Sequence, residues 1–347
     1  MPAKPKSAVN EPEFAHRYPR ETSTGVVALL CEGDVNGYEA SFLETWAAAT
    51  LPNTRVAHVW ACGTGHSLFG TADAIGRTVR FVVIEDRDFR DLAAALADCQ
   101  NLKKDRANRG LAILDWRCWR RNEVENYFLD DDILQPVMAD AFGCSTADVN
   151  DAVDLAVKLL VPFQALQAAI QMTRARWEAT DPQCLIGPSR PQWTTRGLAP
   201  VDPATIESDL KARLIKWRAT LCDNGGLREP WRGDALIDTF KELTTRWATH
   251  SSSSAEWREV WAGKEILKYV RQQLCAGRSG WWSCDRVDPR PLHWAAMPNN
   301  PSRDAHDRFI EKTLLPKLVN RLVDAVTLSP NEPRWAEFKD LAQVLMT

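Results

Sequence analysis

Short apolar runs alternate with runs of helical spacing through the first third of the chain, and this alternation limits the fold more than any other feature. The runs at 25–31 and 79–84 are almost wholly apolar and rich in small or β-branched residues, which is typical of strands buried on both faces. Similar patterns follow each of them: strand-like runs at 56–62 and 111–114, helical spacing at 38–49 and 91–101. The alternation predicts an α/β fold with a parallel sheet and covering helices, in which ligands bind beyond the carboxyl ends of the strands.

Acidic residues stand directly after the two most apolar runs. Glu32 follows the first run, and Asp86 and Asp88 follow the second. Side chains alternate along an extended chain, so Asp86 and Asp88 project to one side, and one sheet edge would gather three carboxylates. Mg²⁺ prefers a few hard oxygen ligands and keeps several waters for a phosphate substrate, and Mn²⁺ is the alternative ion. The sequence therefore predicts a magnesium site and phosphoryl transfer.

These motifs resemble the TOPRIM domain, which topoisomerases, bacterial primases and the overcoming-lysogenization-defect nucleases share. Its signature is an apolar strand ending in Glu-Gly and another ending in Asp-x-Asp, and Glu32-Gly33 and Asp86-Arg87-Asp88 match both halves. The stretch at 119–129, WRRNEVENYFL, resembles a segment of TOPRIM proteins that work with ATPases in anti-phage defence, such as the effector of the PARIS system. The resemblance covers residues 25–130, with a weaker echo at 263–267 in a Gly-Lys element.

The resemblance implies a Rossmann-like TOPRIM domain acting as a metal-dependent nuclease on RNA, including tRNA, or on DNA. It implies a toxic anti-phage effector that works with an AAA or ABC-type ATPase partner, and a homodimer is a further expectation. Glu32 would be a metal ligand or a general acid or base, and Asp86 and Asp88 would bind the metal. Glu125 would complete the metal cluster, and Lys264 would be catalytic by neutralising charge on the scissile phosphate.

Several alternatives stay open around these motifs. Many relatives carry an acid where this chain has Asn36, and Asp34 either replaces that acid or is merely solvated. Glu123 and Glu125 share a face in an extended chain but separate in a helix, and Glu125 is preferred as the site member. The same segment is equally well read as a structural turn whose polar side chains tie the last strand to the helical region. Lys264 is either catalytic or solvated. The Gly-Thr-Gly sequence before His66 is read as a turn in preference to a phosphate loop.

The chain beyond residue 130 has long helical patterns. We expect an N-terminal tail at 1–24, the TOPRIM domain at 25–130 and a mostly α-helical domain at 131–347. The expected segments of the last domain are a helix at 146–180 with a break at Pro162, a Pro-rich connector at 181–203, and helices at 204–221, 233–249, 255–275 and 303–326.

Fifteen tryptophans are unusual, and several stand beside basic residues. Aromatic faces stack on unpaired bases while Arg and Lys follow the phosphate backbone, although packing between helices is the favoured explanation for the tryptophans. Trp281-Trp282 is also a candidate docking patch for another protein. The candidates for nucleic-acid binding are Arg174, Arg176, Lys216 and Arg218.

Composition excludes several classes of protein. A net charge of −3 argues against a basic nucleic-acid wrapper, although it permits a local basic groove. Nine scattered cysteines without a Cys-x-x-Cys pair indicate neither zinc nor a disulfide framework, so a cytoplasmic setting is expected. No signal peptide is expected, because residues 1–24 contain no continuous apolar run. No membrane span is expected, because the apolar stretches fall short of about 18 residues. The alternative function is a non-catalytic binding module of an ATPase complex. A primase-like or topoisomerase-like activity is disfavoured, because no zinc ribbon and no suitable tyrosine context is present.

Overall fold

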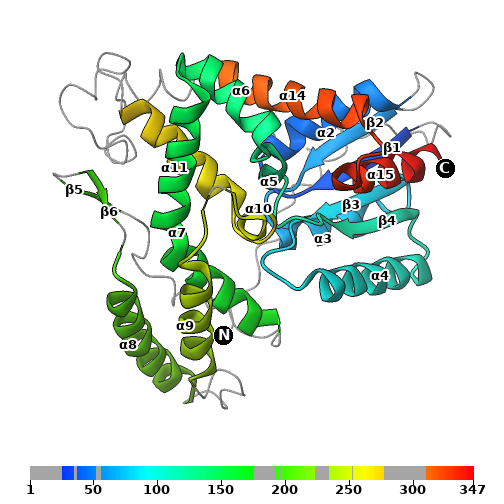
Figure 1. Cartoon of the computed structure of the whole chain (residues 1–347). Helices are drawn as coiled ribbons and strands as arrows, with labels where there is room; N and C mark the ends of the chain where they lie inside the picture. Colours follow the sequence, from blue (N-terminus) through cyan, green and yellow to red (C-terminus); the bar gives the residue numbers. More distant parts are fainter. Residues whose placement is uncertain are drawn as a thin grey trace, which may run out of the picture.

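The computed structural model describes residues 26–34, 37–51, 56–175, 192–194, 197–199, 201–222, 234–251, 253–276 and 310–347. An α/β layer and a set of long helices lie side by side within these residues (Figure 1). The predicted tail at 1–24, part of the predicted connector at 181–203 and the Trp281-Trp282 pair lie outside the described residues.

The sheet has four parallel strands in the order β2-β1-β3-β4. Their bounds are β1 Val26–Cys31, β2 Val56–Ala61, β3 Phe81–Glu85 and β4 Ile113–Cys118. All five residues of β3 are buried, as an almost wholly apolar central strand requires. The prediction of an α/β fold with a parallel sheet is confirmed. Strand β4 begins at Ile113, two residues after the start of the predicted run at 111–114, and continues to Cys118. The charged Asp115, which pairs with Arg117 and Lys103, breaks the apolar pattern but does not end the strand.

Helices cover both faces of the sheet. On one face α3 (Gly65–Ile75) and α4 (Leu92–Asn108) enclose a core that includes Leu30 and Val83. On the other face α2 (Tyr38–Thr50) joins two helices from the end of the chain, α14 (Leu315–Leu328) and α15 (Ala336–Met346), over Leu29 and Val82 (Figure 1). Neighbouring residues of one strand face opposite layers, as side-chain alternation requires. The larger core also contains residues of the long helices, so it includes residues on both sides of residue 130.

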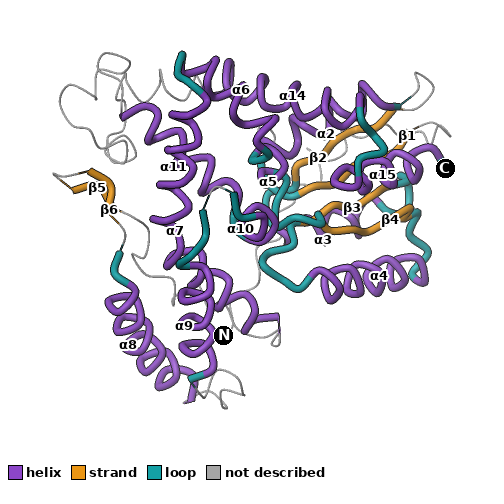
Figure 2. The backbone as a smooth tube through the Cα atoms, viewed as in Figure 1, coloured by secondary structure: helices purple, strands orange, loops and turns teal. Residues whose placement is uncertain are grey.

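The helical region is built around the long helix α7 (Thr146–Ala175), which packs against α9 and α11 (Figure 2). Its elements are α5 Glu125–Phe128, α6 Asp131–Phe142, α7 Thr146–Ala175, β5 Gln192–Thr194, β6 Gly197–Ala199, α8 Pro203–Cys222, α9 Ala235–Trp247, α10 Ala255–Val260, α11 Gly263–Ala276, the π-helical turn η3 Ile310–Leu314 and the 3₁₀ turn η4 Pro333–Trp335. Strands β5 and β6 pair antiparallel.

Two predictions about this region are wrong. Helix α7 continues through Pro162, where a break was expected. The expected single helix at 255–275 is interrupted after Val260, because Trp261 is extended and Ala262 is hydrogen-bonded to the side chain of Gln164. The interruption starts a second helix at Gly263, and this start lies beside α5.

Helix α7 also corrects the expectation that no stretch is long and apolar enough to cross a membrane. Residues 146–173 meet that test by length and composition. However, 78% of the most apolar window is buried inside the protein. The helix is therefore buried as a core helix is, since a membrane helix presents its apolar face to lipid.

Candidate functional site

The acidic residues singled out from the sequence follow three neighbouring strands. Glu32 follows β1, Asp86 and Asp88 follow β3, and Glu123 and Glu125 follow β4. These strands are adjacent and parallel, so the three loops meet at the carboxyl edge of the sheet.

Glu32 lies beside the N-terminus of α3. Gly33 adopts a left-handed conformation, with φ +85, and exchanges two backbone hydrogen bonds of 2.9 Å with Gly63. This bridge brings the start of α3 so close that a Cβ on Gly65 would lie 3.3 Å from Glu32 Oε1. Partial burial and the charges of Asp88 and Glu85 raise the pKa of Glu32 to about 7, against the opposing charges of Arg90 and Lys264. Glu32 can therefore exchange a proton near neutral pH.

The Gly63-Thr64-Gly65 segment forms the start of a helix. Thr64 is the N-cap of α3, and its hydroxyl accepts a hydrogen bond from the Ser67 N–H. The side chain of His66 lies outside the described residues.

The loop after β3 is held in an uncommon backbone conformation. Asp88 and Phe89 are the described non-glycine residues with positive φ, at +52 and +61. The Phe89 N–H donates to Asn122 Oδ1 at 2.5 Å, and the Arg87 N–H donates to the Asn122 carbonyl at 2.8 Å. The loop thus takes its shape from the segment that follows β4, and it leaves Asp88 exposed.

Glu123, and not Glu125, pairs with Lys264. Lys264 Nζ lies 3.1 Å from Glu123 Oε1, and the Lys264 N–H donates to Glu123 Oε2 at 3.2 Å. Glu123 is buried, whereas the Lys264 side chain is 58% exposed. The charge of Glu123, followed by those of Glu125 and Asp86, raises the pKa of Lys264. The pair therefore joins the start of α11 to the acidic loops, and Lys264 remains accessible to a substrate.

Two further acids belong to the same electrostatic cluster. Glu125 begins α5, and its pKa is raised to about 7 by burial and by the charge of Glu123. Glu39, on α2, is buried, and it accepts a hydrogen bond of 2.7 Å from Trp119 Nε1. Burial and the charges of Glu125, Glu32 and Glu123 raise the pKa of Glu39. We call this set the acidic cluster: Glu32, Glu39, Asp86, Asp88, Glu123 and Glu125.

Glu39 is a member of the cluster that the sequence motifs do not indicate. It lies on a helix and not at the end of a strand, where the other acids stand. A signal was present, because Glu39 shares a helix face with the apolar residues Phe42, Leu43 and Trp46. An acid in a predicted apolar stripe is a buried acid, and a buried acid needs a partner or a function.

The acidic cluster suits a hard divalent cation by its donors. It offers carboxylate oxygens and one lysine, the set that Mg²⁺ and Mn²⁺ prefer over zinc. Burial and mutual repulsion raise the pKa of Asp86, through the charges of Glu39, Glu123, Glu125 and Glu32, and a cation would relieve that repulsion. Among the residues that the structure describes, however, no three His, Cys, Asp or Glu side chains are placed to hold a metal ion.

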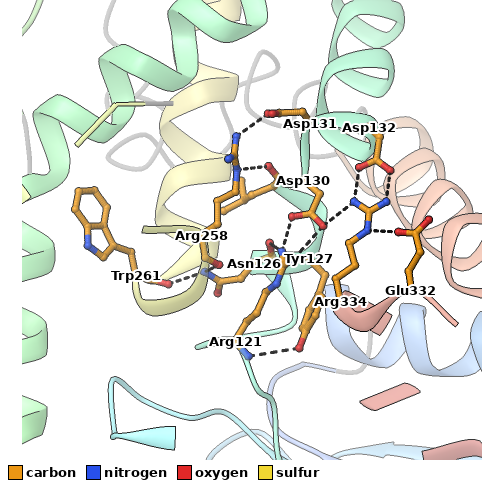
Figure 3. A network of polar contacts seen from close by, with 11 residues as sticks. Arg121, Asn126, Tyr127, Asp130, Asp131, Asp132, Arg258, Trp261, Glu332 and Arg334 are labelled. Carbon is orange, nitrogen blue, oxygen red and sulfur yellow. Dashed lines mark hydrogen bonds and ion pairs between the residues drawn. The ribbon is translucent and has the colours of Figure 1, made fainter. Parts of the chain in front are cut away.

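Asn126 ties the acidic loops to the helical region. Its Nδ2 donates to the carbonyls of Arg258, at 2.9 Å, and Trp261, at 2.8 Å (Figure 3). Its Oδ1 accepts the Glu123 N–H at 3.0 Å. Asn126 is fully buried, so these bonds satisfy a side chain that water does not reach. Asn126 therefore connects the end of the last strand to the helical region, which is the structural role that the sequence left open for the stretch at 119–129.

An arginine and aspartate network lies next to this tie. Arg121, Arg258 and Arg334 each pair with an acid at the start of α6 and line an open pocket of about 390 Å³ (Figure 3). The acids are Asp130, Asp131 and Asp132. Since all three guanidinium groups are already paired with carboxylates, the network fastens α6 to α10 and to η4.

The basic residues predicted to bind nucleic acid are not part of the acidic cluster. Lys216 and Arg218 lie on α8, which packs on α9, far from β4 (Figure 1). Arg218 Nη1 lies 3.9 Å from Asp234 Oδ1. The side chain of Arg174 and the whole of Arg176 lie outside the described residues.

Many of the described tryptophans are packing residues. Seven of them are fully buried: Trp46, Trp116, Trp119, Trp247, Trp257, Trp261 and Trp335. The packing explanation therefore holds for these seven residues, because a base cannot stack on a ring that is already enclosed.

Comparison of the chain with known protein families, with curated proteins and with solved structures found no match.

Proposed function

We propose that this chain is a metal-dependent TOPRIM nuclease that cleaves RNA or DNA and serves as a toxic effector of an anti-phage system. The observation that carries the proposal is the acidic cluster with Lys264 at the carboxyl edge of three adjacent parallel strands. Carboxylates gathered at one place destabilise a protein because they repel one another, and such an arrangement is usually found where it serves a function.

The chain's own residues have separable tasks in this proposal. Glu32, Asp86, Asp88 and Glu125 would hold Mg²⁺ or Mn²⁺, which when bound polarises a phosphoryl oxygen and activates water. Glu32 and Glu125, whose pKa values are raised to about 7, are suited to take or give a proton near neutral pH. Lys264 keeps its positive charge and is exposed, so it can contact the phosphate that is cleaved.

Substrate and partner follow from the resemblance to TOPRIM effectors. The substrate would be RNA, including tRNA, or DNA, and the partner an AAA or ABC-type ATPase in the cytoplasm. A second function, a non-catalytic binding module of such a complex, is favoured by one observation. No three acidic side chains among the described residues are placed to hold a metal ion.

The test is cleavage of nucleic acid by the purified protein with Mg²⁺, followed by sequencing of the ends produced. Wild type should cleave, whereas Glu32→Ala and Asp86→Ala should not, although both should stay folded. Glu44→Ala is the matched control, since Glu44 is an exposed acid of α2 outside the cluster. Equal cleavage by wild type and by both cluster variants would overturn the nuclease assignment. Binding without cleavage by wild type would favour the binding module.

A further inference from the structure

Arg87 stands between the two predicted metal ligands, but its side chain leaves the acidic cluster. The residue is 6% exposed. Its Nη1 donates to the Arg120 carbonyl at 2.5 Å, and its Nη2 donates to the Glu259 carbonyl at 2.7 Å. A guanidinium group that is enclosed and bonded to two carbonyls is not available to a phosphate, so its contribution must be made through the loop that carries it.

The second carbonyl belongs to the helical region. Glu259 lies on α10, 172 residues along the chain from Arg87. The same carbonyl also accepts the Asn122 N–H at 2.8 Å. Asn122 in turn accepts the N–H groups of Arg87 and Phe89, one at its carbonyl and one at Oδ1. Arg87, Asn122 and Glu259 therefore form a closed ring of hydrogen bonds, which we call the loop clamp.

The loop clamp explains how the chain keeps Asp88 and Phe89 in the left-handed region. A non-glycine residue in this region is strained, and the conformation persists only where the surroundings fix it. The clamp bonds the backbone on either side of Asp88, at Arg87 and at Phe89. The charge of Asp88 acts on Glu32 and Glu123, so a movement of this loop changes the surroundings of both acids.

We propose that Arg87 is a positioning residue that fixes Asp88 in the acidic cluster by fastening its loop to α10. This inference rests on the proposed function, since it assigns Arg87 a task in the binding of the metal. It also means that the α/β part does not complete the site alone, because the Glu259 carbonyl comes from the helical region.

The test compares Arg87→Gln and Arg87→Lys with wild type in the full-length protein. Arg106→Gln is the matched control, since Arg106 is also a buried arginine, 8% exposed, but lies on α4 and stacks over Phe69 and Trp116 in the opposite layer. Three quantities are measured: Mn²⁺ binding by electron paramagnetic resonance, the Mg²⁺ concentration for half-maximal cleavage, and hydrogen exchange at the Phe89 amide.

Arg87→Gln should weaken Mn²⁺ binding about tenfold, raise the Mg²⁺ requirement by a similar factor and speed exchange at the Phe89 amide. Arg87→Lys should recover part of each change, since an ammonium group can still donate to one of the two carbonyls. Arg106→Gln should lower the melting temperature and leave all three quantities unchanged.

Wild-type values in Arg87→Gln would overturn the inference, as would equal losses in Arg87→Gln and Arg106→Gln. If Arg87→Gln does not fold, the comparison between Arg87→Lys and Arg106→Gln decides in the same way. If wild type neither binds Mn²⁺ nor cleaves, the proposed function fails and the positioning task fails with it. Faster exchange at the Phe89 amide would then show only that the clamp holds the loop.

Discussion

Replacing Gly263 with alanine should push the start of α11 away from the acidic cluster, because it adds one methyl group at their contact. A Cβ at Gly263 would lie 2.7 Å from the Asn126 nitrogen, 2.8 Å from the Glu125 carbonyl carbon and 2.9 Å from Asn126 Oδ1. Asn126 is fully buried and held by three side-chain hydrogen bonds, so it cannot move aside at low cost. Gly263 does not have positive φ, so the clash alone causes the effect.

The size of the effect follows from these distances. Ordinary contact begins at 3.4 Å, so the start of α11 must retreat by about 0.7 Å from the Asn126 nitrogen. The hydrogen bond from the Lys264 N–H to Glu123, now 3.2 Å, would lengthen beyond the range in which it contributes. Forcing an extra methyl group into a packed contact costs about 1–3 kcal/mol, so we expect a melting temperature lower by several degrees and reduced cleavage.

The assay is thermal unfolding together with cleavage at saturating Mg²⁺. Gly70→Ala is the control, since Gly70 lies inside α3 with no heavy atom within 4 Å of an added Cβ. Helix propensity alone should make that variant more stable, by up to about 1 kcal/mol. If Gly263→Ala shows the same gain as Gly70→Ala and cleaves like wild type, the close approach between α11 and α5 does not constrain the site.

Three further predictions concern charge. The folded-state pKa of Glu32, about 7, lies above its unfolded value, so the folded state binds more protons and stability falls as pH rises through that interval. Glu32→Gln should flatten that fall and raise the free energy of unfolding at pH 8 by up to about 3 kcal/mol, and an unchanged slope in urea unfolding at pH 5 and pH 8 would refute this. Arg334 lowers the pKa of Asp132 by hydrogen bonding, so Arg334→Gln should cost about 1 kcal/mol at pH 7 in thermal unfolding and less near pH 3; an equal loss at both pH values would contradict the assignment. Replacing the four predicted phosphate-binding residues with Glu should weaken nucleic-acid binding and make the binding constant less dependent on salt concentration. A salt dependence equal to that of wild type would show that these residues do not contact phosphates. These residues are Arg174, Arg176, Lys216 and Arg218.

The parts of the fold that sequence predicted are those with local signals. The strands ending at Cys31 and Glu85 can be predicted from sequence, because a strand that is buried on both faces is apolar along almost its whole length. The acids after them could be placed at one edge from topology alone. In contrast, Glu123 pairs with Lys264 across 141 residues, and no periodic pattern records a contact between elements so far apart. Nothing local in the sequence distinguishes Glu123 from Glu125 as the partner of Lys264, because that pairing depends on where α11 packs.

The position of α11 also explains how an edge rich in carboxylates holds together. Glu123 is buried near other acids, and a buried charge without a partner is very costly. Lys264 supplies both an opposite charge and a backbone N–H, and Glu123 in return satisfies a donor at the start of α11 that has no partner within its own helix. Lys264 thus compensates the buried charge of Glu123, and Glu123 accepts a hydrogen bond from the otherwise unpaired N–H of Lys264. Both interactions form only when α11 packs against the acidic loops. It follows that the acidic loops and the start of α11 should unfold together, and that variants at this contact should change the cluster without altering any of its acids.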